Sequence, residues 1–326
     1  MDIRFIISHL LSEKPSHTPT LPYPHTAYKP ESIAGLFKRM RASIRIIIVC
    51  LLAGLVGPLP GRAQWIEAPG QGWVEVAVYH HDTRKRFDPS RSLEPLFNAD
   101  ARAITTSLYL TAVVGVVQGA DVWVQMPYNR LEFNDIAADR QSIGIGDPRI
   151  HLRFGPELFG VRSPVPVAVR GGVKLPFGEF TNDAEIIPLS EGQTDWEVML
   201  ELGHSFYPAP FYAMAWAGYR WRTYNDDIDR KPGDERFAYT AVGGTLRSFE
   251  WKLAAEGLSG LAPRRRQAGV EFVLEQDKRE LVQILPSIGR RLGPGTVALG
   301  GRFPVAGRNL PAGPAVFVSY FMRFGF

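Results

Sequence analysis

Cysteine is almost absent from this chain of 326 residues, whose single thiol belongs to Cys50. A disulfide bond within the chain needs two thiols, and a metal site built on cysteine needs more than one, so both are excluded. Cys50 also lies in an apolar run that has the pattern of a cleaved leader. Without that leader the chain has no thiol, which excludes thiolate catalysis as well.

A long apolar run is missing too. The run IIIVCLLAGLVG at 46–57 has twelve residues, whereas a helix needs about 20 to cross the hydrocarbon core of a bilayer. The short basic stretch MRASIR precedes it, and PLPGRA, with the small residues Gly61 and Ala63, follows it. This order predicts a signal peptide over residues 40–63, cleaved before Gln64. A short membrane anchor is the alternative for the same segment.

The basic excess of the chain is confined to its first part. The net charge is +4, but residues 1–63 hold eight of the 37 Lys and Arg and three of the 33 Asp and Glu, which leaves 29 basic and 30 acidic residues. Nothing in this near-neutral remainder predicts nucleic-acid binding. Residues 1–39 have no pattern that predicts a fold, and a start codon assigned too early, with Met40 as the true start, would explain them.

Helical periodicity is nearly absent after Gln64, and runs of alternating apolar and polar residues take its place. Alternation with a period of two is typical of β-strands that have one apolar face. Twelve such runs are present, and an even number is typical of single-chain outer-membrane barrels. They cover 72–83, 103–117, 121–134, 145–155, 164–176, 195–207, 211–224, 236–247, 250–262, 280–292, 296–306 and 314–326.

The connections between these runs alternate between short and long. Three residues or fewer separate several pairs, as in PAP and GPG, whereas RKRFDPSRSLEPLFNADA and FGEFTNDAEIIPLSEGQT are long. One connection, at 156–163, is intermediate. Long loops at one end only are typical of a membrane barrel, with short periplasmic turns and long external loops, and not of a soluble β-sandwich. We therefore expect residues 64–326 to form an all-β, transmembrane, antiparallel up-and-down barrel of about twelve strands.

The charged residues of these runs share one face. A barrel of this size would leave a cavity if its apolar face pointed inward, so we expect the charges inside and the aliphatic side chains in lipid, with the inverted soluble barrel as the alternative. The predicted charged lining consists of Asp147, Arg149, His151, Arg153, Arg170, Lys174, Asp195, Glu197, Glu201, Arg220 and Arg222. These residues either pair to hold the wall together or form a constriction that selects solutes.

Four aromatic residues fall on the same predicted inward face, namely Tyr109, Trp123, Tyr212 and Trp216. They offer places where an apolar or aromatic solute could rest. Filling space in a barrel of intermediate width is the alternative explanation.

The chain ends on an apolar strand face made by Tyr320, Met322, Phe324 and Phe326. Such a terminal strand resembles the signal that the outer-membrane assembly machinery reads, and its aromatic residues suit the membrane interface. An ordinary edge strand that ends in Phe is the alternative.

No motif places a nucleophile beside a base. His80 and His81 are adjacent and therefore point to opposite faces of a strand, so they cannot share a metal or a substrate. The glycine-rich strings GIGDP, RGGV and ALGG lie within predicted strands and lack the strand-to-helix context of a phosphate loop. The sequence therefore predicts no enzyme, no catalytic residue, no metal and no cofactor.

Several stretches resemble a known family. IGIGDPRIHLRF, VAVRGGVKLPFGEF, LSEGQTDWEVMLELGHSF and GRFPVAGRNLPAG, with the G-x-x-x-P-x-G element at Gly172–Gly178 and GQTD at Gly192–Asp195, look like Gram-negative outer-membrane proteins grouped as the phenol meta-pathway degradation, or "transporter", family. The resemblance runs from Asp121 to Phe326. It implies a barrel of this size that admits aromatic or other hydrophobic compounds, with no catalytic residue or cofactor.

These observations predict a bacterial outer-membrane channel that passes small solutes, aromatic or hydrophobic ones among them, through a charged lumen. A structural or adhesive barrel with a closed lumen is the second hypothesis, and an outer-membrane hydrolase is the third. The expected partners are outer-membrane lipid and lipopolysaccharide, the assembly machinery and small-molecule solutes, with no nucleic acid.

Overall fold

The structure is a computed structural model that describes residues 66–97, 101–136, 138–181, 183 and 185–325. The predicted leader, the segment upstream of it and Phe326 lie outside these residues. Within the described ranges, no helix combines the length and the hydropathy that crossing a membrane requires.

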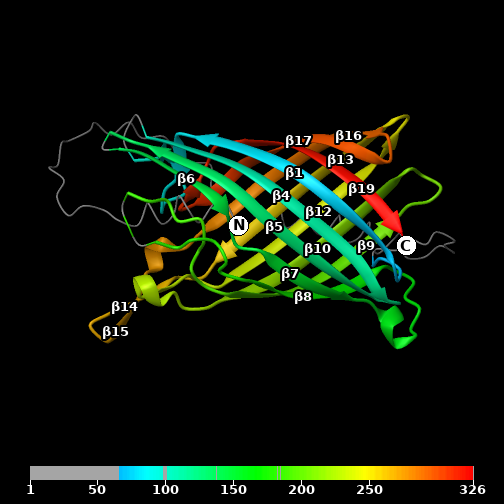
Figure 1. The fold of residues 1–326 in the computed structure, drawn as a ribbon, viewed down its shortest axis with the longest axis horizontal. Coiled ribbons are helices and arrows are strands. Elements are labelled where there is room, and N and C mark those ends of the chain that lie inside the picture. The colour runs from blue at the N-terminus through cyan, green and yellow to red at the C-terminus, as the bar shows by residue number, and fades with distance from the viewer. Residues whose placement is uncertain (1–65, 98–100, 137, 182, 184, 326) are drawn as a thin grey trace.

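The described chain forms one closed antiparallel barrel (Figure 1). β1 pairs with β4 on one side and with β19 on the other, which joins the first strand to the last. β6 and β7 both pair with β5 and together occupy one position in the wall, so the predicted all-β barrel of twelve strands is confirmed. The wall strands are β1 (Gln71–Thr83), β4 (Arg102–Val117), β5 (Ala120–Asn134), β6 (Asp139–Ile145), β7 (Arg149–Phe154), β8 (Val167–Lys174), β9 (Asp195–Ser205), β10 (Phe211–Arg222), β12 (Glu235–Leu246), β13 (Phe249–Gly260), β16 (Glu280–Leu292), β17 (Gly295–Arg308) and β19 (Ala315–Gly325).

The fourth predicted strand is wrong in two respects. The sequence predicts one unbroken strand over 145–155, but this position of the wall begins at Asp139, and Gly146, Asp147 and Pro148 separate β6 from β7. Pro148 has no N–H to give to the ladder. The Asp147 carboxylate accepts the backbone N–H groups of Phe177, at 3.2 Å, and Glu191, at 2.9 Å. These contacts hold Asp147 in a break of the wall and not, as expected, within a strand.

The connections divide between the two ends of the barrel. At one end, which we call periplasmic, β4–β5, β12–β13 and β16–β17 are joined by two residues each, while longer turns join β9 to β10 and, through η2 (Pro156–Phe159), β7 to β8. The other end, which we call external, carries the long loops. Those loops contain β2 (Lys85–Phe87), β3 (Leu93–Pro95), η3 (Asp226–Ile228), β11 (Arg230–Lys231), β14 (Arg264–Gln267), β15 (Val270–Val273), η4 (Glu275–Asp277) and β18 (Leu310–Pro311).

Aliphatic side chains cover the outside of the wall. Val169, Leu200 and Val318 are 46%, 50% and 51% exposed, while Lys174 of β8 and Asp195 and Glu197 of β9 are buried inside. A soluble barrel would bury the aliphatic residues and expose the charged ones. The inverted alternative is therefore excluded, and hydrocarbon is the medium that these side chains fit.

Two apolar clusters fix external loops to the inner wall. Leu96 of the β3–β4 connection and Ile187 and Leu189 of the β8–β9 loop pack with Leu131 and Phe133 of β5. On another part of the wall, β2 and β18 contribute to a cluster that is completed by residues from β13 and β16, namely Phe87, Leu258, Leu281 and Leu310. Both clusters lie at the external end, so parts of these loops fold inward.

The segment before β1 closes against the periplasmic end. Ile66 and Glu67 are buried, and the Glu67 N–H donates to Asp121 at 3.0 Å. Gly115 permits this approach, because a Cβ atom there would lie 2.1 Å from the Ala68 carbonyl oxygen. The start of the described chain therefore occupies part of the periplasmic entrance.

A charged side chain introduced on the lipid-facing side should lower the free energy of unfolding, and more so the deeper it lies in the bilayer. Leu200 is the middle residue of β9, and Leu246 ends β12 beside a turn. We expect Leu200→Arg to lower the free energy of unfolding by about 2–4 kcal/mol and Leu246→Arg by about 1 kcal/mol or less. Urea unfolding in phospholipid vesicles measures both, and an equal loss for the two variants would contradict the assigned orientation.

Candidate functional site: the charged and aromatic lumen

Opposite charges face one another across adjacent strands inside the barrel. The register aligns Lys174 of β8 with Asp195 of β9, and Asp195 with Arg222 of β10. One step toward the periplasm it aligns Glu197 with Arg220. The inward-facing charges predicted from the sequence thus form a set of cross-strand ion pairs.

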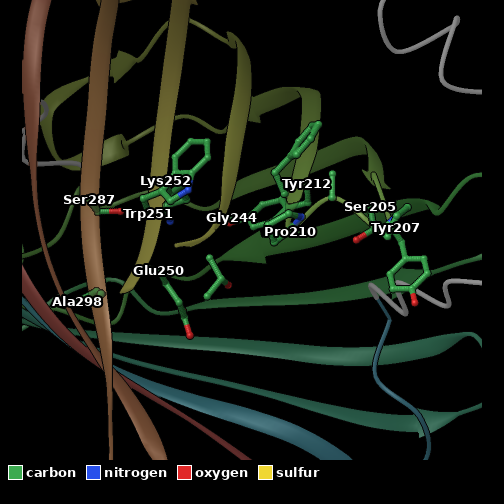
Figure 2. A pocket seen from close by; sticks show the side chains of 15 residues that line it. Ser205, Tyr207, Pro210, Tyr212, Gly244, Glu250, Trp251, Lys252, Ser287 and Ala298 are labelled. Atoms are coloured by element: carbon green, nitrogen blue, oxygen red, sulfur yellow. The ribbon is translucent and has the colours of Figure 1, made fainter. Parts of the chain in front are cut away.

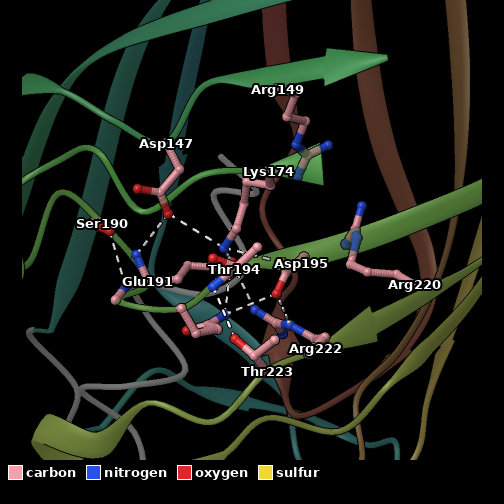
Figure 3. Close-up of polar contacts among 12 residues, drawn as sticks. Asp147, Arg149, Lys174, Ser190, Glu191, Thr194, Asp195, Arg220, Arg222 and Thr223 are labelled. Atoms are coloured by element: carbon pink, nitrogen blue, oxygen red, sulfur yellow. Dashed lines mark hydrogen bonds and ion pairs between the residues drawn. The ribbon is translucent and has the colours of Figure 1, made fainter. Parts of the chain in front are cut away.

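The outermost group of these ion pairs is buried, and Figure 3 shows its contacts. The Lys174 ammonium is 3.1 Å from Asp195 and 3.4 Å from Asp147, and it also contacts Glu191. The Arg222 guanidinium reaches Glu191 at 2.8 Å and Asp195 at 3.3 Å. Glu191 comes from the β8–β9 loop, so this group ties that loop to three strands.

The charge state of Glu191 follows from its partners. Burial disfavours its ionised form, but Arg222 and Lys174 outweigh burial and hold the pKa of Glu191 well below its usual range. Glu191 is therefore a carboxylate at neutral pH, and the group contains two cations and three carboxylates. Glu235 links it to the next layer through Arg222, at 3.6 Å.

A second layer is centred on Glu197. Its carboxylate is 2.7 Å from Arg220 and 3.0 Å from His151 Nε2, with Arg149 at 4.0 Å. Arg220 also contacts Glu235 at 2.5 Å, and Arg279 reaches the same carboxylate at 2.6 Å. Arg220 therefore bridges β9 and β12 across β10.

A third layer lies closer to the periplasm. Arg153 binds Asp121 at 2.6 Å and approaches Glu201 to 3.5 Å, while Arg170 lies 2.7 Å from Glu201. The Arg170 guanidinium is also 5.7 Å from the centre of the Trp123 ring. An aromatic residue of the predicted lining is therefore part of the charged wall.

The whole network is electrically balanced. Across the three layers, seven Lys and Arg side chains lie within ion-pair distance of seven carboxylates. Because each charge has an opposite neighbour, the charges of the wall largely cancel and present little net charge to a solute. All eleven charged residues predicted from the sequence belong to it.

Aromatic side chains gather elsewhere on the inner wall. Tyr109 meets the Tyr79 ring edge-on at 5.4 Å, and Tyr79 stacks on Phe317 at 5.0 Å. The Arg302 guanidinium lies 4.4 Å from the centre of the Tyr79 ring. Trp216 of β10 stacks on its cross-strand neighbour Tyr239, 5.1 Å away. These rings lie on the inner wall between the two ends of the barrel.

A cavity of about 650 Å³ lies inside the periplasmic half of the barrel (Figure 2). Tyr212 of β10, Glu250 and Lys252 of β13, and the hydroxyl groups of Ser205 and Ser287 line it. Within the described part of the chain, Lys252 makes no ion pair, in contrast to the cations of the charged wall. The cavity therefore offers an aromatic surface, hydroxyl groups and an ammonium group to a small molecule.

Some members of this lining were missed in the sequence. Asp121 and Glu235 lie in the inward register at the starts of β5 and β12, and the same alternation would have found them. Glu191 and Arg279 lie in loops, where no period indicates direction. Among the described residues, no group of three or more His, Cys, Asp or Glu could hold a metal ion.

The predicted assembly signal lies on the outer face of β19 as far as it is described. Tyr320, Met322 and Phe324 pair with Val76, Val74 and Gly72 of β1 and alternate with inward residues. The face is therefore turned toward lipid, and its recognition by the assembly machinery stays a prediction.

No protein-family model and no curated protein matches this chain. Among solved structures, the COG4313 outer membrane channel from Pseudomonas putida F1 aligns with a TM-score of 0.65 at 12% identity, over 82% of this chain and 100% of that one. The NanC porin (0.43, 12%, 76% and 98%) and the CymD monoaromatic hydrocarbon channel (0.39, 9%, 80% and 90%) also align, at scores too low to support an argument. The fold is that of a bacterial outer-membrane β-barrel, and the family resemblance read from the sequence stays a prediction.

Removing one partner from the outermost ion pairs should destabilise the barrel. Lys174→Met leaves three buried carboxylates near one remaining cation, so we expect a loss of about 3–5 kcal/mol in the free energy of unfolding. Arg91→Met breaks an exposed pair with Glu280, 2.8 Å apart, and should cost about 1 kcal/mol or less. Urea unfolding in vesicles compares the two. Equal losses in the free energy of unfolding for the two variants would mean that the charge of Lys174 contributes no more to stability than the charge of the exposed Arg91.

Proposed function

We propose that the chain is an outer-membrane channel that passes small solutes, with aromatic or other hydrophobic compounds as the candidate class, through a charged lumen. The cavity inside the periplasmic half of the barrel is the observation that carries this proposal. Its volume of about 650 Å³ lies in the range of small-molecule sites. The Pseudomonas putida protein of similar fold is itself described as an outer membrane channel.

The two sides of the lumen suit different parts of a solute. The charged wall is internally paired, so it offers hydrogen bonds without attracting a particular ion. Tyr79, Tyr109 and Phe317 offer aromatic surface above the cavity, and Tyr212 offers it within. A planar apolar molecule with one polar group has contacts of both kinds along this route.

A channel in the outer membrane also requires that the chain is exported and assembled there. We infer export by a signal peptide cleaved before Gln64, assembly through recognition of the terminal strand, and residence among outer-membrane lipid and lipopolysaccharide. The aliphatic outer surface supports the lipid contact. Members of the phenol meta-pathway degradation family, which the sequence resembles, would share this location.

A structural or adhesive barrel with a closed lumen is the second candidate. The two apolar clusters at the external end and the loop tied down through Glu191 favour it. In that case the external loops carry the function. The third candidate, a hydrolase, is tested by lipase, esterase and protease assays on the refolded protein.

Neutralising two inward carboxylates should change ion selectivity. Glu197→Gln with Glu201→Gln leaves Arg153, Arg170 and Arg220 with fewer counter-charges, so we expect the anion-to-cation permeability ratio to rise by at least about two-fold. Single-channel recordings in planar bilayers measure it. The matched control is Glu94→Gln with Glu280→Gln, two carboxylates paired with arginines in and beside the external loops.

Two results would count against the channel or its charged lining. A folded barrel that is electrically silent and also fails to raise solute flux into liposomes would reject the channel in favour of the closed barrel. A conducting barrel with unchanged selectivity would mean that Glu197 and Glu201 only support the wall.

A further inference from the structure

A small sheet at the external end takes no part in the barrel wall. It consists of β11, β14 and β15 and connects the β10–β12 loop to the β13–β16 loop. Figure 1 shows β14 and β15 projecting from the end of the barrel opposite the carboxyl terminus. We call residues 264–273 the arginine hairpin, because β14 begins with three consecutive arginines, Arg264, Arg265 and Arg266.

Both strands of the arginine hairpin are exposed throughout. Val270, Phe272 and Val273 are 55%, 48% and 54% exposed. Val270 and Phe272 lie on the same face of β15, and contiguous exposed apolar groups commonly mark a contact surface. Arg265 lies directly opposite Phe272 in the register. One face of the hairpin therefore combines a cation with an apolar ring.

The arginines are only partly neutralised by the protein. Arg264 binds Glu271 at 3.0 Å. Arg266 lies 4.5 Å from the centre of the Tyr224 ring, a contact that leaves its charge in place. Arg265 makes no ion pair within the described residues. Because side chains alternate between the two faces of a strand, Arg265 shares one face with Val270 and Phe272, whereas Arg264, Arg266 and Glu271 lie on the other. The face that combines Arg265 with the apolar groups therefore carries an uncompensated guanidinium group.

The position of the hairpin determines which part of the membrane its exposed surface contacts. β13 and β16 are wall strands with lipid-facing residues such as Leu253 and Ile284, which are 50% and 41% exposed. The hairpin follows directly on the external end of β13. It therefore stands at the level where hydrocarbon gives way to the head groups of the outer leaflet, which in this membrane is rich in phosphorylated glycolipid.

We propose that the arginine hairpin binds the phosphate groups of the outer-leaflet glycolipid, lipid A with its phosphorylated inner core. The planar guanidinium group matches phosphate oxygens in pairs and keeps its charge at any physiological pH. Val270 and Phe272 add apolar contact with the same molecule. The proposal rests on the outer-membrane placement proposed above and is independent of solute passage.

The test measures lipid A binding to the refolded full chain in detergent micelles. The variant is Arg264→Gln with Arg265→Gln and Arg266→Gln, and the matched control changes three arginines at the periplasmic end, Arg162, Arg290 and Arg291, to Gln. Fluorescent lipid A is titrated by anisotropy at two salt concentrations. We expect at least about ten-fold weaker binding and a shallower salt dependence for the hairpin variant, and the wild-type affinity for the control.

Competition identifies the source of the phosphate. Unlabelled lipid A should displace the probe at far lower concentration than inorganic phosphate or dephosphorylated lipid A. Equal competition by inorganic phosphate would overturn the glycolipid assignment and leave a general anion site. Competition by an acidic peptide at concentrations as low as lipid A would favour a protein partner instead and would also overturn it.

Separate control measurements test the folding and the channel function of the variants. Heat-modified mobility in gels reports the folded barrel, and Arg265→Glu alone provides a second variant if the triple change disturbs folding. Wild-type binding by Arg265→Glu, or an equal loss in the periplasmic control, would overturn the proposal. Single-channel conductance of the hairpin variants should equal that of the wild type, so failure of lipid A binding is distinguishable from failure of the channel.

Discussion

Closure of the hydrogen-bond ladder between β1 and β19 is the constraint on which the rest of the structure depends. Hydrocarbon offers no partner for a backbone N–H or C=O group, so a sheet can span a bilayer only if it has no free edge. Eleven residues of β1 pair in register with β19, and twelve pair with β4. Once the sheet closes, every strand has one face in lipid and one face in a confined interior. The alternation of each strand then decides which side chains share that interior.

Confinement explains why the interior charges are paired. A charged side chain enclosed by the wall loses much of its hydration, and an opposite charge on the next strand restores part of the lost free energy. Lys174, fully buried, contacts three carboxylates, and Arg220 joins two strands that are not neighbours. The same pairs fasten the β8–β9 loop through Glu191. The ion pairs thus fasten an external loop to the charged wall. In the periplasmic half, a cavity remains.

The two ends of the barrel differ in how loops and side chains fill them. Apolar clusters and ion pairs draw external loops inward, whereas the arginine hairpin extends away from the barrel. At the periplasmic end, Ile66 and Glu67 cover part of the entrance and the cavity beside Tyr212 and Lys252 remains.

Strand number, strand limits and the orientation of each face were determined by the sequence alone, because a period of two is a local property and hydrocarbon enforces it along every strand. Eleven of the twelve strands ended within three residues of their predicted limits, and the exception, at Gly146–Pro148, depends on distant N–H groups that bind Asp147. The tertiary structure alone decided which charges meet, since Glu191 and Arg279 lie in loops whose direction no pattern encodes. It also decided where the cavity lies, because the space inside a barrel depends on how loops and side chains from many strands fill it together.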